Sequence, residues 1–146
     1  MALPFLFGVG LLKAFVGKGL LVKLGLTSKI TVASIASVAG VAAGASAYKY
    51  LMPKAVDAVN KALKEHQWSF TITQNQVEQA HNLLISIDPN LPLVKSMEKM
   101  VFKSMPELYQ ALLVKVHGWK EELAYAVSVA LWYWIELVNE EQENPA

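Results

Sequence analysis

Two long stretches of mainly apolar residues open the chain and predict two helices, over residues 2–26 and 28–52. The second stretch contains 19 consecutive residues without a charge, from Ile30 to Tyr48. With a rise of about 1.5 Å per residue, a helix of that length nearly spans the hydrocarbon core of a bilayer, which is about 30 Å thick. We therefore expect residues 1–52 to form an apolar helical hairpin in a membrane or in an equally apolar protein interior.

Small side chains repeat along one face of the second predicted helix. Ala36, Gly40 and Gly44 are spaced four residues apart, so they lie on the same side of a helix. In membranes this spacing lets two helix backbones approach closely and pack. An alanine-rich helix at the centre of a soluble bundle would carry the same pattern, and that interpretation stays open.

The remaining residues, 53–146, follow the period of amphipathic helices. Capping-box spacing marks the starts of two of them, at Thr73 with Gln76 and at Ser104 with Glu107. The predicted fold class is therefore all-α, with a domain boundary between residues 52 and 53. The expected helices and the two breaks between them are 53–67, the linker WSFTIT (68–73), 74–85, the break DPNLP (88–92), 92–103, 105–117 and 119–143.

The last predicted helix contains 13 residues without a charge, from Leu123 to Ile135. A run of that length suits a buried core helix better than a full membrane span. Trp132 and Trp134 lie near the end of this run. Both tryptophans fit either an aromatic belt at a membrane surface or ordinary core packing.

Charge is divided unequally along the chain. Residues 1–56 contain six lysines and no acidic residue, whereas residues 57–146 contain seven lysines and all twelve acidic residues. A basic and apolar front half is what an anionic membrane surface favours. In composition, residues 2–26 resemble membrane-active and viral fusion peptides, and the resemblance implies contact with lipid. The predicted interface residues are Lys13, Lys18, Lys23, Lys29, Tyr48, Lys49, Tyr50, Trp132 and Trp134.

The sequence offers little for catalysis. It has no cysteine, which excludes disulfides and thiol chemistry, and it has no P-loop, nucleophile elbow or dinucleotide fingerprint. Glu78 and His81 form a single E-x-x-H, whereas a di-iron site needs two such motifs, so we interpret them as a surface pair. Every basic residue is lysine, which makes nucleic acid a poor partner. We expect no enzyme activity, no cofactor, no metal and no small-molecule substrate.

A cluster of methionines with one phenylalanine lies in the predicted 92–103 helix and just after it: Met97, Met100, Phe102 and Met105. Core packing is the favoured interpretation, and a partner-docking face is the alternative if these side chains are exposed. The predicted function is a non-catalytic membrane protein, a structural or accessory subunit of a larger or homo-oligomeric assembly. Its expected partners are membrane lipid and protein. The alternatives are a membrane-permeabilising or lysis protein and a soluble helical interaction module.

Overall fold

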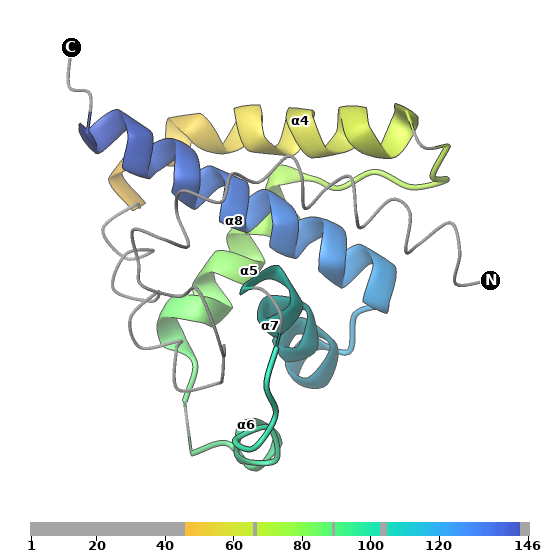
Figure 1. The fold of residues 1–146 in the computed structure, drawn as a ribbon, viewed down its shortest axis with the longest axis vertical. Helices are drawn as coiled ribbons and strands as arrows, with labels where there is room; N and C mark the ends of the chain where they lie inside the picture. The colour runs from red at the N-terminus through yellow and green to blue at the C-terminus, as the bar shows by residue number, and fades with distance from the viewer. Residues whose placement is uncertain (1–45, 66, 89, 103–104, 144–146) are drawn as a thin grey trace.

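The computed structural model describes residues 46–143, apart from 66, 89 and 103–104, and this part of the chain is helical without a β-strand (Figure 1). The all-α prediction is confirmed for these residues. The predicted hairpin lies outside them except for residues 46–52. In chain order the elements are η2 (Ser46–Leu51), α4 (Met52–Glu65), α5 (Gln74–Ser86), α6 (Pro92–Lys95), α7 (Met105–Leu112), η3 (Leu113–His117) and α8 (Glu121–Glu143).

Helix α8 is the central element of the described fold. It contacts α4, α5 and α7, which surround it, as Figure 1 shows. Every side chain from Ala124 to Trp132 is buried, and so are Trp134 and Ile135. A helical segment that is apolar on all sides must be covered by protein or by lipid, and in α8 the neighbouring helices α4, α5 and α7 provide the cover. The predicted core role of this uncharged run is confirmed.

The described part of the chain has no helix that combines the length and the apolarity needed to cross a bilayer.

Helices α4 and α5 are amphipathic and present their apolar faces to the core. In α4, Val56, Val59 and Leu63 are buried, as the sequence pattern predicts. Helix α5 begins at the predicted capping box. The Gln76 N–H donates to Thr73 Oγ1 at 3.2 Å, and the Thr73 N–H donates to Gln76 Oε1 at 2.9 Å. Two backbone donors that the helix itself cannot satisfy are thereby paired.

The predicted helix over 92–103 is wrong for most of its length. Helix α6 ends at Lys95, and tight turns follow, in which the Met97 N–H donates to Val94 O at 2.9 Å. The Ser96 hydroxyl donates to Leu93 O at 2.6 Å, which is a local bond that competes with the regular helix ladder. Val94 and Met97 are both buried in the hydrophobic core, and this tertiary packing overrides the helical spacing.

Two other predicted boundaries also differ. Residues 46–51, expected as the end of a long helix, form a 3₁₀ helix with a break at Tyr48, where φ is −111° and ψ is 29°. Helix α4 begins at Met52 rather than Pro53.

Helix α7 continues into the π-helical turn η3, which ends at Gly118 in the left-handed conformation with φ 69°.

Candidate functional site

An open groove of about 480 Å³ lies between the second half of α4 and the linker that follows it. Its volume falls within the range of about 300–1,000 Å³ that is typical of small-molecule sites. The lining combines one face of the helix with four consecutive linker residues: Asn60, Lys61, Lys64, Trp68, Ser69, Phe70 and Thr71.

The end of α4 turns the chain back to form one side of the groove. The Trp68 N–H donates to Leu63 O and the Gln67 N–H donates to Lys64 O, both at 3.0 Å. These two bonds are the Schellman pattern, which satisfies carbonyls at a helix C-terminus. Gln67 takes the left-handed conformation that the pattern requires, with φ 60°. The turn therefore places Trp68 beside Lys64 in the groove lining.

Asn60 holds the far end of the linker against α4. Its Nδ2 donates to Ile72 O at 2.9 Å, and the Ile72 N–H donates to Asn60 Oδ1 at 2.8 Å. One side-chain amide thus pairs both backbone groups of a buried residue. Because the linker is held at both of its ends, residues 68–71 line the groove in a defined conformation.

The groove has an aromatic wall and a basic edge. The rings of Trp68 and Phe70 meet edge to face, with centroids 5.5 Å apart and planes at 79°. Both rings are half-buried, whereas Lys61 and Lys64 are exposed and lie three residues apart on one helix face. Its described lining residues include no carboxylate or imidazole, so the chemistry that they support is binding rather than proton transfer.

The predicted membrane-interface residues separate into three groups. Lys13, Lys18, Lys23 and Lys29 lie outside the described residues, as do the predicted helix-packing residues Ala36, Gly40 and Gly44. At the junction with α4, Lys49 and Tyr50 are exposed and Tyr48 is half-buried. Trp132 and Trp134 are buried in the core of the described fold. Of the two interpretations of these tryptophans, an aromatic belt or core packing, their burial fits core packing.

The Glu78–His81 pair is not the surface pair that the sequence suggested. His81 is only 1 % exposed, because it lies on the face of α5 that also buries Val77 and Leu84. Its ring meets Trp134 of α8 edge to face, with centroids 4.8 Å apart. Within the described ranges, no group of three or more His, Cys, Asp or Glu residues is arranged to hold a metal.

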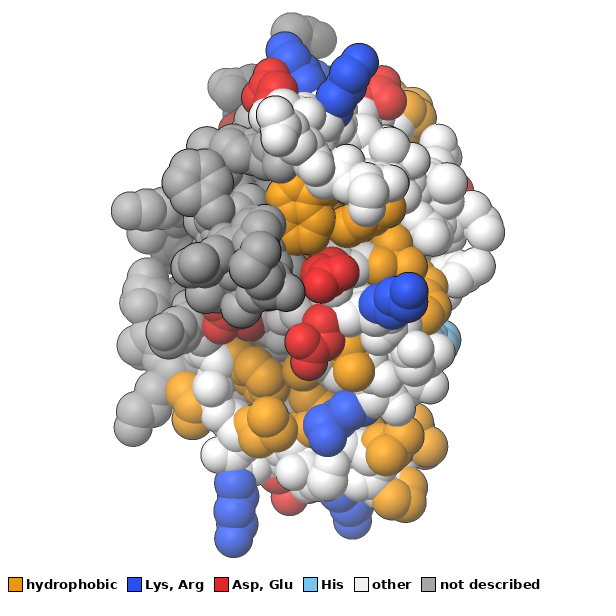
Figure 2. Space-filling view, turned by 90° about the vertical axis from the view of Figure 1, so that its right-hand side faces the viewer, with side chains coloured by type: hydrophobic (Ala, Val, Ile, Leu, Met, Phe, Trp, Pro, Cys, Tyr) orange, Lys and Arg blue, Asp and Glu red, His pale blue; other side chains and the backbone are white. Residues whose placement is uncertain are grey.

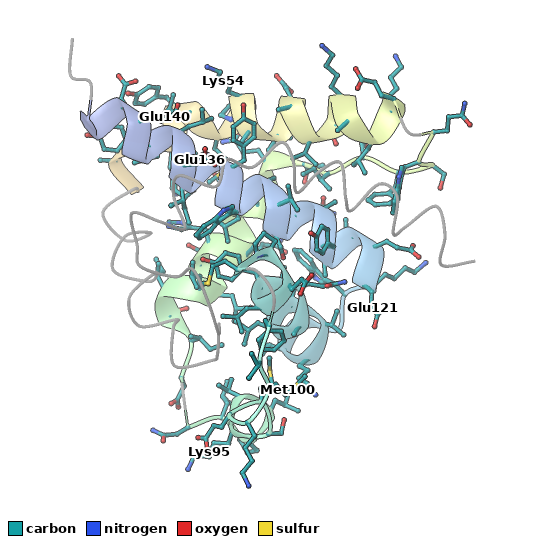
Figure 3. All side chains as sticks on the ribbon, viewed as in Figure 1. Lys54, Lys95, Met100, Glu121, Glu136 and Glu140 are labelled. Carbon is teal, nitrogen blue, oxygen red and sulfur yellow. The ribbon has the colours of Figure 1, made fainter. Side chains whose placement is uncertain are left out.

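The methionine cluster is divided between core and surface. Met97 and Met105 are fully buried and Phe102 is half-buried against the core, whereas Met100 is 42 % exposed. These four residues therefore share no single exposed face. Of the predicted docking residues, Met100 is the one at the surface, and it lies near α6 at the narrow end of the described fold (Figure 3).

Sequence reasoning missed the groove, although part of its signal was visible. The aromatic and hydroxyl residues alternate from Trp68 to Thr71, close behind Lys61 and Lys64. The pattern predicts a linker, and the structure has a linker there, but the bond that folds it onto α4 joins Asn60 and Ile72, which are twelve positions apart. Comparison with protein-family models, curated proteins and solved structures gives no match for this chain.

Proposed function

We propose that this chain is a non-catalytic helical membrane protein that serves as a structural or accessory subunit of a larger or homo-oligomeric assembly. In this proposal residues 1–45 contact lipid and pack against other helices. The helical domain of residues 46–143 faces water and meets a protein partner. The charge-free residues 30–45 and the lysines that precede them support the lipid contact.

The observation that carries the proposal is the junction between these two parts. Trp134 Nε1, on the central helix, donates to the backbone carbonyl of Tyr48 at 3.1 Å. Tyr48 is the last residue of the uncharged run, and it is followed by the exposed Lys49 and Tyr50. A lysine and a tyrosine at that point suit the headgroup layer of a bilayer. The bond anchors the end of the apolar segment directly to the buried core of the helical domain.

Membrane fractionation of the expressed full-length chain, followed by an alkaline carbonate wash, tests the lipid contact. We expect the protein to stay in the pellet, because carbonate strips proteins held only by charge and leaves inserted helices in place. Release into the supernatant without detergent would overturn the membrane proposal. The soluble interaction module would then be the better interpretation.

The assembly is tested separately with a matched pair of variants in the second predicted helix. Gly40→Leu places a large side chain on the predicted packing row, whereas Ala42→Leu adds a similar volume about 200° around the helix. We expect Gly40→Leu to disperse the assembly in light scattering of detergent-solubilised protein, and Ala42→Leu to leave it intact. Both variants should remain in the membrane pellet. Equal assembly in all three proteins would contradict the proposed helix packing.

Leakage from anionic vesicles separates the subunit from the permeabilising alternative. The proposed subunit should cause no dye release at micromolar concentration. Dye release that falls when Lys13, Lys18 and Lys23 are neutralised would instead favour a pore-forming or lysis protein.

A further inference from the structure

We infer that the groove between α4 and the 68–71 linker is a binding site for a phosphate group attached to an apolar or aromatic body. This inference does not depend on the proposed membrane function. It rests on the lysines, aromatic rings and hydroxyl residues that the groove lining combines.

The basic edge of the groove matches a phosphate monoester. In the described part of the chain, neither Lys61 nor Lys64 makes an ion pair, and the exposed acids on the same helix, Asp57 and Glu65, do not line the groove. A phosphate monoester carries a charge of about −1.5 to −2 near neutral pH, which two ammonium groups balance. A single carboxylate carries only one negative charge, so its attraction to the two lysines is weaker than that of a phosphate monoester.

The aromatic wall of the groove matches the rest of such a ligand. Trp68 and Phe70 are half-buried members of the groove lining, and the exposed residues Ser69 and Thr71 belong to the same lining. Hydroxyl groups donate to phosphate oxygens, and ring faces bind apolar or aromatic groups. Because Asn60 and the end of α4 hold the linker in place, ligand binding would order little additional backbone.

A second pair of exposed lysines, far from the groove, tests whether charge attraction alone would explain phosphate binding. Figure 2 shows lysine side chains projecting at the upper end of the molecule, where α4 lies, and at the lower end, where α6 lies. At the lower end, the exposed Lys95 and Lys99 are also close in sequence, and Figure 3 places Lys95 far below α4. They carry the same charge as Lys61 and Lys64 but do not line the groove.

The test measures binding of phenyl phosphate to the full-length protein by equilibrium dialysis, with inorganic phosphate as the second probe. We expect phenyl phosphate to bind more tightly than inorganic phosphate. The double variant Lys61→Ala with Lys64→Ala should lose about tenfold or more in affinity for both probes. The matched double variant Lys95→Ala with Lys99→Ala should stay within about twofold of the unmodified protein. Phe70→Leu should weaken phenyl phosphate binding and leave inorganic phosphate unchanged.

Two outcomes would overturn the inference. The first is no saturable binding of phenyl phosphate by the unmodified protein at millimolar concentration. The second is an equal loss in the two double variants, because that result means general charge attraction. All four lysines are exposed, and circular dichroism melts check that each variant remains folded.

Two further probes identify the source of the phosphate. Dihexanoyl phosphatidic acid carries the phosphate of a lipid headgroup, whereas adenosine monophosphate carries that of a soluble metabolite. Tighter binding of the phosphatidic acid that the Lys61→Ala with Lys64→Ala variant loses assigns the groove to lipid headgroups. Tighter binding of the nucleotide that the same variant loses assigns the groove to soluble phosphates. If neither of these two probes binds and phenyl phosphate does not bind either, the first overturning outcome applies and the proposed site is refuted.

Discussion

Asn60 offers the sharpest test of how the groove is built, because one side chain makes both of the bonds that hold the linker at Ile72. The substitution Asn60→Ala removes a 2.9 Å bond to Ile72 O and a 2.8 Å bond from the Ile72 N–H. Each neutral hydrogen bond contributes about 0.5–1.5 kcal/mol net, so the free energy of unfolding should fall by about 1–3 kcal/mol. The upper part of that range applies if water does not replace the amide, because Ile72 is buried.

Urea unfolding followed by circular dichroism measures the stability change, and hydrogen exchange locates it. We expect the Ile72 amide to lose its protection while amides in α8 keep theirs, because local opening of the linker leaves the central helix packed. Asn75→Ala is the matched control, since Asn75 is exposed at the start of α5, and it should change stability by less than about 0.5 kcal/mol. A loss below about 0.5 kcal/mol in Asn60→Ala, with Ile72 still protected, would refute the role of Asn60.

Three other predictions follow from the described contacts. Gly118→Ala should lower the free energy of unfolding by about 1–2 kcal/mol, because φ is 69° although an added Cβ would meet nothing within 4 Å; Gly118→Asn should cost less in the same urea assay. Thr73→Ala should cost about 1 kcal/mol through the lost cap of α5, whereas Thr73→Ser should recover most of it in thermal melts. Burial raises the pKa of the Tyr109 phenol well above its usual value, and burial followed by the Glu107 charge raises that of Tyr125. Both phenols have a higher pKa in the folded state than in the unfolded chain, where it is about 10. The stability gained by keeping these phenols neutral is therefore complete below about pH 10 and is lost as the pH rises above that value. Ultraviolet titration should show these phenols ionising only on unfolding.

The start of α5 could be predicted from the sequence because all of its information is local. Thr73 and Gln76 are three residues apart, and their side chains exchange bonds with each other's backbone. The same holds for the buried stripe of α4, in which Val56, Val59 and Leu63 follow helical spacing. Features of this kind need no knowledge of what the helix packs against.

The region after α6 could not be predicted in this way. Leu93, Met97 and Met100 fit one face of a helix, but the structure buries Met97 and leaves Leu93 and Met100 exposed. Which residues of this segment are buried depends on the contacts of Val94 and Met97 in the core. The local sequence pattern carries no information about those contacts. The groove escaped prediction for a similar reason, since it depends on the bond from Asn60 to Ile72 and on a left-handed residue, Gln67, that is not glycine.

The central helix also shows which part of the sequence supports the membrane proposal. The 13 uncharged residues from Leu123 to Ile135 are accommodated by protein, with Trp132 and Trp134 in the core rather than at a lipid surface. Absence of charge by itself therefore does not require lipid in this chain. The structure places the last three residues of the uncharged run, 46–48, in the 3₁₀ helix η2, so the length of that run does not separate it from the run in α8. What distinguishes the front half is its charge, because residues 1–56 contain six lysines and no acidic residue. A basic stretch without carboxylates suits an anionic membrane surface, and the carbonate wash decides whether that stretch is also inserted into the bilayer.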